Sequence, residues 1–269
     1  MNNSPIGIFD SGVGGLSVLK KVVKVLPNES IVYFADTARC PYGPKTLDTI
    51  YNYSKQICNF LISQHKVKAI IIACNTATIA SIDRLKLDFD IPIIGVPDYG
   101  AQDANEQTIN KKIGLLATDA TVNSNYYQNK LKGYDQENII IGQGCPEFVL
   151  DVESNNFAGD TVEKHVKEYT EEMVKEGVDT IILGCTHFPF LKDTINKVLN
   201  NSVKIIDPAD STVNYVASYL KEHNLLASDN NKASIELFSS SDHNETLISL
   251  IKGILNEDKT VTQIDIDTY

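Results

Sequence analysis

The strongest constraint on the fold is an internal duplication. Three landmarks of the first half of the chain return in the second half at nearly the same spacing: Ile6-Gly7-Ile8-Phe9 as Ile113-Gly114-Leu115-Leu116, Cys40-Pro41 as Cys145-Pro146, and residues 70–76 as residues 181–187. The last pair is an apolar run that ends in a cysteine followed by small polar residues. Self-similarity of this kind is typical of repeated structural units. The sequence therefore predicts two related units, at about residues 1–97 and 98–207.

Short β-branched runs alternate with amphipathic stretches, which is typical of α/β proteins with parallel strands. We expect strands at residues 6–9, 31–34, 69–73, 91–96, 113–116, 139–141, 180–183 and 203–206, and helices at 16–26, 47–65 and 162–175. The remaining residues, 208–269, have no counterpart in the repeat. They predict a helix at 211–221, a strand at 234–238, a helix at 244–255 and a strand at 261–266. This part either completes the first sheet or forms a small appendage.

These patterns predict an α/β fold of two pseudo-symmetric, doubly wound domains with mainly parallel sheets that face a central cleft. The first domain is expected to be discontinuous, with residues 1–97 plus 208–269, and the second to contain residues 98–207. Ligands of open parallel sheets bind outside the carboxyl ends of the strands. Because Cys74 and Cys185 each follow a predicted strand, two facing units would bring one cysteine to each side of the cleft.

Composition excludes several functions. A net charge of −11 with no cluster of Lys or Arg argues against a nucleic-acid partner. No apolar run approaches the ~20 residues of a membrane span, and the start lacks the features of a signal peptide, so we expect a cytoplasmic protein. Five cysteines, an odd number without a C-x-x-C pair, indicate free thiols. A structural zinc site needs clustered Cys and His ligands, and the only near pair of these is Cys185 with His187, so no metal site is expected.

A pair of thiols on opposite sides of a cleft suits inversion at a carbon centre. Inversion requires a base on one face and an acid on the other, and a thiolate and a thiol can exchange these roles. A free cysteine is only a few per cent ionised at pH 7, so the site is expected to lower the pKa through helix N-termini or a nearby histidine. Either Cys74 or Cys185 alone could simply be a buried, small apolar residue. Their repetition in two units favours catalysis.

Other polar residues follow the same strands. Asp10 and Ser11 could bind an ammonium group and orient Cys74, although the glycine-rich segment after them is also consistent with a plain strand-to-helix turn. The pair Tyr42-Gly43 is either a simple turn or a source of a backbone N–H for an anionic side chain. His187 lies two residues beyond Cys185 and is expected to tune its thiol. Glu153 is a candidate to orient His187, or else an ordinary solvated glutamate.

Four blocks together resemble the glutamate racemase family, a group of cofactor-independent aspartate/glutamate racemases. These blocks are Asp10-Ser11-Gly12-Val13-Gly14-Gly15-Leu16, Asp36-Thr37-Ala38-Arg39-Cys40-Pro41-Tyr42-Gly43, Ala73-Cys74-Asn75-Thr76-Ala77-Thr78 and Gly184-Cys185-Thr186-His187-Phe188-Pro189. They are ordered and spaced as in the family, over about residues 6 to 190. Each block alone would be unspecific, and the set of four is specific.

The resemblance implies interconversion of L- and D-glutamate, which supplies D-glutamate for bacterial peptidoglycan, with no cofactor or metal. It implies that Cys74 and Cys185 are the acid/base catalysts, supported by Asp10 and His187, and that Cys185 acts on L-glutamate. It further implies two α/β domains around a cleft, a C-terminal stretch that returns to the first domain, and a homodimer. The family's substrate contacts correspond to Asp10, Ser11, Tyr42, Gly43, Asn75, Thr76, Thr186 and His187.

One segment departs from the family pattern. The strand expected at 91–96 is followed by Pro97-Asp98-Tyr99-Gly100, with the proline two places earlier than is usual in the family. We expect this to affect the crossover between the domains rather than the site. Three rival interpretations remain open: aspartate racemase, a decarboxylase with a single active thiol, and a two-lobed protein that binds an amino acid without catalysis. The second cysteine argues against the decarboxylase.

Overall fold

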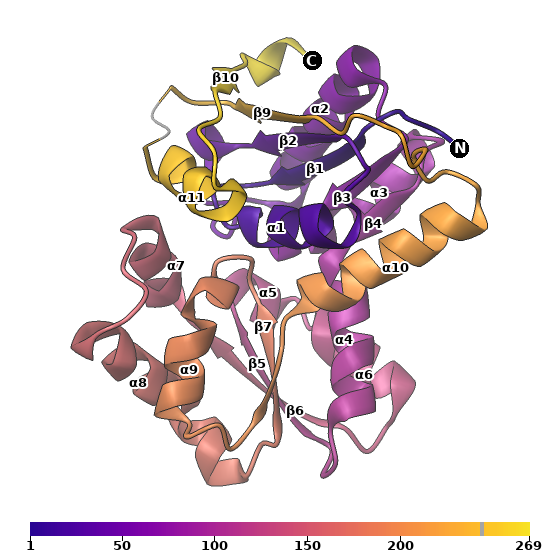
Figure 1. The fold of residues 1–269 in the computed structure, drawn as a ribbon. Coiled ribbons are helices and arrows are strands. Elements are labelled where there is room, and N and C mark those ends of the chain that lie inside the picture. Colours follow the sequence, from indigo (N-terminus) through magenta and orange to yellow (C-terminus); the bar gives the residue numbers. More distant parts are fainter. Residues whose placement is uncertain (243–244) are drawn as a thin grey trace.

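A computed structural model describes residues 1–242 and 245–269. It contains two parallel β-sheets, each covered by helices on both faces (Figure 1). The first sheet has the strand order β10-β9-β2-β1-β3-β4 and the second has the order β6-β5-β7-β8. Every strand pair in both sheets is parallel. The predicted α/β fold of two mainly parallel, doubly wound units is confirmed.

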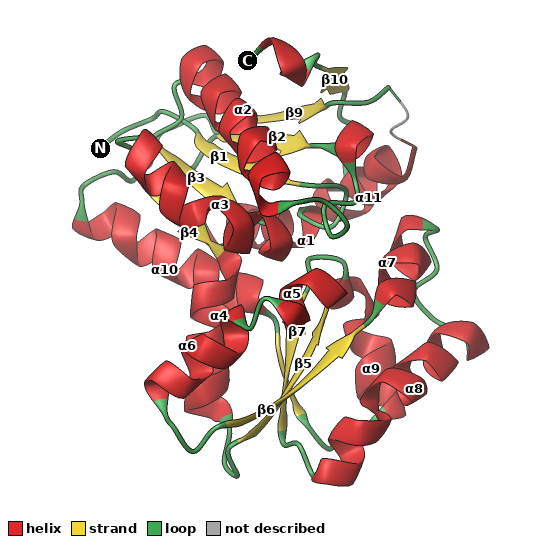
Figure 2. Ribbon diagram, turned by 180° about the vertical axis from the view of Figure 1, so that it is seen from behind, coloured by secondary structure: helices red, strands yellow, loops and turns green. Residues whose placement is uncertain are grey.

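The first sheet combines segments from both ends of the chain (Figure 2). Its strands are β1 (Ile6–Asp10), β2 (Ile31–Ala35), β3 (Ala69–Ile72), β4 (Ile93–Gly95), β9 (Ile235–Ser239) and β10 (Val261–Gln263). Its helices are α1 (Leu16–Val25), η1 (Thr37–Arg39), α2 (Leu47–His65), α3 (Asn75–Asp88), α10 (Pro208–Glu222), α11 (Glu245–Leu255) and η3 (Ile266–Thr268). Of the helix expected at 244–255, residue 244 lies outside the described residues.

The second sheet is formed by consecutive segments. Its strands are β5 (Lys112–Ala117), β6 (Ile139–Gly144), β7 (Thr180–Gly184) and β8 (Lys204–Ile206). Its helices are α4 (Val96–Gln107), α5 (Asp119–Asn123), α6 (Tyr126–Tyr134), α7 (Pro146–Glu153), α8 (Asp160–Glu176), η2 (Phe188–Leu191) and α9 (Lys192–Val198). The order β2-β1-β3-β4 in the first sheet matches β6-β5-β7-β8 in the second, so the duplication seen in the sequence is a duplication of topology.

Alternating side chains of the strands fill two cores on each sheet. In β1, Ile6 and Ile8 pack with α1, α10 and α11 on one face, whereas Phe9 packs with α2 and α3 on the other. In the second sheet, Leu116 packs towards α7, α8 and α9, and Leu115 packs towards α4 and α6. Since both faces are covered, every residue of β1, β2, β3 and β7 is buried, as expected for parallel sheets.

The chain passes between the sheets through α4 and returns through α10, and these two helices pack against each other (Figure 1). Gly100 permits this contact, because a Cβ there would lie 2.5 Å from the Cβ of Pro208. The unusual Pro97 falls in the first turn of α4, where a missing N–H costs nothing. Asp98 accepts a hydrogen bond from Tyr126 at 2.6 Å, and Tyr99 stacks on Tyr215. The departure from the family pattern therefore lies in the crossover, as expected.

Several expected strands differ from the observed ones at their ends. The strand expected at 91–96 is short, because α4 begins at Val96. The last expected strand, 261–266, ends at Gln263, and a 3-10 turn follows it.

In the described part of the chain, no helix has both the length and the apolar character that a membrane crossing needs.

Candidate active site

A cavity of about 370 Å³ opens at the carboxyl ends of strands from both sheets. Residues of the first sheet's half and of the second sheet's half contribute to its walls. The first group is Ser11, residues 40–44 and residues 74–76, and the second is residues 118–120, Pro146, Val149, Leu150 and residues 184–187. The cavity thus has the position expected for a ligand site in parallel sheets. Cys74 from the first group and Cys185 from the second both line it.

Cys74 occupies the N-cap position of α3. Its Sγ accepts a hydrogen bond from the N–H of Ala77 at 3.4 Å and lies 3.3 Å from Oγ of Ser11. Burial and the nearby negative charge of Asp10 nevertheless raise the pKa of the Cys74 thiol to about 12. The expectation that the site lowers this pKa is therefore wrong for Cys74. The physical reason is that the helix terminus and Ser11 supply only dipoles, which do not outweigh the loss of water.

Cys185 follows β7 and has a different environment. Its Sγ lies 3.6 Å from Nδ1 of His187, and Nε2 of His187 lies 2.7 Å from Oε1 of Glu153. Burial acts to lower the pKa of His187, but the contacts with Cys185 and Glu153 outweigh it and raise the pKa to about 10. His187 is then an imidazolium at neutral pH. A cation beside a cysteine favours its thiolate, so the two thiols are chemically unequal. The contact of Glu153 with His187, expected from the sequence, is present.

Asp10 lies behind the cavity wall. It is fully buried, accepts hydrogen bonds from the N–H of Gly12 at 2.9 Å and from the hydroxyl of Thr186 at 3.2 Å, and is not among the described residues that line the cavity. Burial raises the pKa of its carboxyl, while the charge of His187 opposes this rise. The bond to Thr186 joins the two halves of the molecule, and so does the bond from Ser17 to the carbonyl of Thr186 at 3.0 Å.

Asn75 and Thr76, the first residues of α3, also contact the other half. Oδ1 of Asn75 accepts a hydrogen bond from the hydroxyl of Tyr127 at 2.7 Å. Oγ1 of Thr76 lies 3.3 Å from Oγ1 of Thr118 and 3.4 Å from that of Thr121. The amide of Asn75 and the hydroxyl of Thr76 line the cavity at the start of a helix, where free N–H groups favour an anion.

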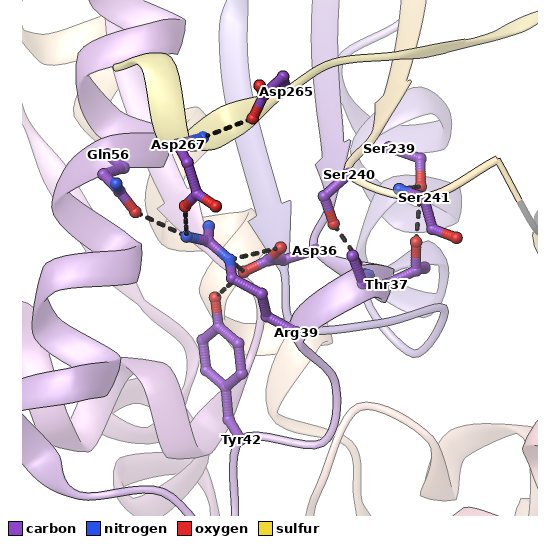
Figure 3. Close-up of polar contacts among 11 residues, drawn as sticks. Asp36, Thr37, Arg39, Tyr42, Gln56, Ser239, Ser240, Ser241, Asp265 and Asp267 are labelled. Carbon is purple, nitrogen blue, oxygen red and sulfur yellow. Dashed lines mark hydrogen bonds and ion pairs between the residues drawn. The ribbon is translucent and has the colours of Figure 1, made fainter.

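The expected residues Tyr42 and Gly43 lie in the loop between η1 and α2. The hydroxyl of Tyr42 donates to the buried carboxylate of Asp36, which also accepts from Nε of Arg39 (Figure 3). Because its hydroxyl is engaged there, Tyr42 offers the cavity its ring and backbone. A Cβ at Gly43 would meet no atom within 4 Å, so the peptide of Gly43 is accessible from the cavity that it lines.

Two groups of lining residues were not predicted from the sequence. Thr118, Asp119 and Ala120 follow β5, which is the counterpart of β1 in the repeat. The position of Asp10 and Ser11 after β1 was therefore a usable signal for them. Val149 and Leu150, on α7, form an apolar wall, and their sequence pattern does not distinguish them from core residues.

The cysteines are all free thiols. Within residues 1–242 and 245–269, no three side chains of His, Cys, Asp or Glu gather in a way that could hold a metal ion. The cavity is lined by the thiols of Cys40, Cys74 and Cys185, the imidazole of His187, the carboxyl group of Asp119, and residues with hydroxyl and amide groups.

The chain thus has a duplicated α/β fold in which both halves contribute residues to one shared cavity. The family model for Asp/Glu/Hydantoin racemase matches residues 6–216. The chain belongs to this family and is a racemase, as the motifs of the sequence predicted.

Relatives and solved structures agree with this assignment. The chain is 39% identical over 270 residues to the glutamate racemase of Thermoanaerobacter pseudethanolicus (strain ATCC 33223 / 39E), with 100% of both chains covered. It is similar to glutamate racemase isoform RacE1 from Bacillus anthracis, with a TM-score of 0.92, 34% identity and 98% of each chain covered. It is also similar to glutamate racemase from Francisella tularensis in complex with D-glutamate, with a TM-score of 0.91, 35% identity and 100% of each chain covered.

Proposed function

We propose that this racemase interconverts L- and D-glutamate without a cofactor, by proton transfer between the substrate and two thiols. The observation that carries the proposal is that one cavity is lined by Cys74 from the first sheet's half and by Cys185 from the second sheet's half. A carbon centre bound between them has one sulfur on each face. Glutamate is favoured over aspartate because full-length relatives at about 40% identity are glutamate racemases.

In the proposed mechanism, the Cys185 thiolate removes the α-proton of L-glutamate and becomes a thiol. The Cys74 thiol then donates its proton to the opposite face of the carbanion and becomes a thiolate. The number of protons on enzyme and substrate is unchanged, and D-glutamate runs the same steps in reverse. The imidazolium of His187, held by Glu153, stabilises the thiolate of Cys185. General acid–base catalysis of this kind contributes ~10²–10⁴-fold to a rate.

The remaining lining residues are proposed to bind and orient the substrate. The hydroxyls of Ser11, Thr76 and Thr186 and the amide of Asn75 suit the polar groups of an amino acid, and the peptide of Tyr42-Gly43 suits its anionic side chain. Asp10 is proposed to act from behind the wall. It orients Thr186 and adds a negative charge that stabilises both the His187 imidazolium and a nearby substrate ammonium group.

Further parts of the proposal concern the cell and the assembly. Production of D-glutamate for peptidoglycan, a cytoplasmic location and a homodimer are proposed from the family resemblance. We also propose a domain division at residues 1–97 plus 208–269 and 98–207. It is supported by the pairing of β9 with β2, which adds the C-terminal strands to the first sheet. Its first boundary falls after the second residue of α4.

Incubation with L-glutamate in D₂O tests the proposed reaction. We expect D-glutamate that carries deuterium at the α-carbon, at a rate unchanged after dialysis against a chelator. Aspartate is the matched control and should exchange slowly. Faster exchange of aspartate than of glutamate would contradict the substrate, and binding without α-proton exchange would contradict the reaction. Loss of activity on dialysis would contradict cofactor independence.

A further inference from the structure

The wall of the cavity at residues 41–44 belongs to a loop without helix or strand. It follows η1, and α2 begins shortly after it. Its shape therefore depends on the contacts of its side chains. The largest of these is Tyr42, which is 1% exposed and packs in the core between the first sheet and α2. The hydroxyl of Tyr42 donates to Asp36.

Asp36 carries a completely buried carboxylate at the end of β2. Arg39 compensates its charge, with Nε 3.0 Å from Oδ1 and 2.8 Å from Oδ2. A buried carboxylate without a cationic partner is strongly unfavourable. The acceptor for the Tyr42 hydroxyl therefore depends on the position of the Arg39 guanidinium.

Arg39 is held by residues from two further elements (Figure 3). Its Nη1 donates to Oε1 of Gln56 on α2 at 2.6 Å and to Oδ1 of Asp267 on η3 at 3.2 Å. Its Cζ lies 4.0 Å from the ring centroid of Tyr53. The Arg39 side chain is only 11% exposed. A cation from the solvent or from a surface side chain therefore cannot take its place beside Asp36.

The C-terminal turn η3 is itself anchored to the first sheet and to α2. Ile266 is 3% exposed and packs in the same core cluster as Tyr42. The N–H of Ile264 donates to the carbonyl of Ser239 at 2.8 Å, and Asn59 on α2 donates to the carbonyl of Tyr269 at 3.3 Å. The contacts of η3 thus reach the cavity wall through Asp267, Arg39, Asp36 and Tyr42 in turn.

We propose that Arg39 is a positioning residue for the cavity wall formed by residues 41–44, and that the C-terminal turn η3 sets its position through Asp267. This inference rests on the proposed function, because it assumes that the ligand bound at residues 41–44 is glutamate. Arg39 is not among the described residues that line the cavity. Its Nε is directed to Asp36 and its Nη1 to Gln56 and Asp267 (Figure 3), while its buried Nη2 has no hydrogen-bond partner. Its loss should weaken substrate binding and leave proton transfer intact.

The test compares Arg39 with Arg84, which has a similar set of contacts away from the cavity. Nη1 of Arg84 lies 2.7 Å from Oδ1 of Asp48, and its Cζ lies 3.4 Å from the ring centroid of Tyr51. The variants are Arg39→Lys, Asp267→Asn, Arg84→Lys and Asp48→Asn. Each is measured for KM and kcat in both directions, for the dissociation constant of D-glutamate by calorimetry, and for Tm.

For Arg39→Lys we expect KM and the dissociation constant to rise about tenfold, since hydrogen bonds to a charged group are lost, with kcat within about twofold of wild type. For Asp267→Asn we expect a rise of about two- to threefold, because this ion pair is partly exposed. The Arg84 and Asp48 variants should leave both constants unchanged. If Arg39→Lys does not fold, Tyr42→Phe replaces it, and we expect the same separation of KM from kcat.

Two results would overturn the inference: equal changes of KM in the Arg39 and Arg84 variants, or a fall in kcat with KM unchanged. A wild-type protein that binds D-glutamate without exchanging its α-proton would contradict the two-thiol proposal instead. In that event, the dissociation constants of the variants still decide the role of Arg39.

Discussion

Glu153 lies 2.7 Å from Nε2 of His187, on the side of the imidazole that faces away from Cys185. One thiol of the cavity therefore has a carboxylate-held imidazole beside it, whereas the other has only Ser11 and a helix N-terminus. The repeat that places the thiols symmetrically does not make their environments equal. This inequality leads to the first two predictions.

Cys185 should react with an alkylating reagent faster than Cys74 at pH 7. The Sγ of Cys185 lies 3.6 Å from Nδ1 of His187, and cysteines beside a cation are the reactive ones, whereas burial raises the pKa of Cys74 to about 12. Iodoacetamide labelling of the ligand-free protein, followed by peptide mass spectrometry, should show Cys185 ahead by about tenfold or more. In His187→Asn the difference in labelling rate between Cys185 and Cys74 should disappear. Earlier labelling of Cys74 would refute the assigned inequality.

The stability of the protein should fall as the pH rises from about 6.5 to 10. The folded pKa of His187 is raised from 6.5 to about 10, so its protonation stabilises the folded state fully below the lower value and no longer does so above the higher one. Urea unfolding at several pH values measures this loss. His187→Asn should show a weaker pH dependence over the same range, and an identical dependence in both proteins would count against a protonated His187.

Replacement of either active-site cysteine should abolish racemisation in both directions, because inversion needs both partners. We expect Cys74→Ala and Cys185→Ala each to reduce turnover by about a thousandfold or more. In D₂O the remaining thiol can still exchange the proton of the enantiomer that it faces, which is L-glutamate for Cys74→Ala and D-glutamate for Cys185→Ala. Proton NMR of the α-position distinguishes these results. Exchange of the same enantiomer by both variants would contradict the two-thiol mechanism.

Gly14→Ala should impair catalysis far more than folding. A Cβ at Gly14 would lie 2.4 Å from Oγ1 of Thr186 and 2.7 Å from Nδ1 of His187, so both side chains must move. A displacement of about 1 Å at an active site can cost ~10²-fold in rate, and we expect a fall in kcat of this order. The control is Gly133→Ala, where a Cβ meets no atom within 4 Å. Wild-type kcat in a folded Gly14→Ala protein would show that the placement of His187 is unimportant.

The cysteines other than Cys74 and Cys185 should be dispensable for proton transfer. Cys58 and Cys145 are fully buried, so their replacement by Ala is expected to cost ~1–3 kcal/mol in stability. Cys40 lines the cavity, but its counterpart in the repeat, Cys145, is not among the described lining residues, so these two do not form a pair in the cavity. Cys40→Ser should therefore retain turnover. Thermal unfolding and steady-state kinetics test these variants, and a thousandfold loss in any folded one would mean that the catalytic pair is misassigned.

Much of the fold followed from the sequence because the repeat and the period of apolar residues are local signals. The strands β1, β2, β5 and β7 were placed to within one residue at each end. The short β4 was not, since the tight packing of Gly95 against Thr78 and the early start of α4 depend on tertiary contacts. The sequence also did not decide whether residues 208–269 join the first sheet, because the local sequence of a strand does not show which other strand it pairs with.

The site was predictable where it follows strand ends and unpredictable where it depends on electrostatics. The repeat indicated Cys74 and Cys185 together, and the proximity of His187 to Cys185 in sequence made their contact plausible. The raised pKa of Cys74 results from burial and from Asp10, which are properties of the assembled cavity. Likewise, the spacing of Arg39 and Asp267 along the chain gave no sign that they are in contact.

The N-cap position of Cys74 ties the reaction cycle to the end of a helix. Its sulfur accepts the N–H of Ala77, and a negatively charged cap stabilises a helix N-terminus more than a neutral one does. The first turn of α3 should therefore be more stable when Cys74 is a thiolate and less stable when it is a thiol. Asn75 and Thr76 belong to this turn. The affinity of this turn for the ligand should therefore differ between the two protonation states of Cys74, and hence between the two directions of the reaction.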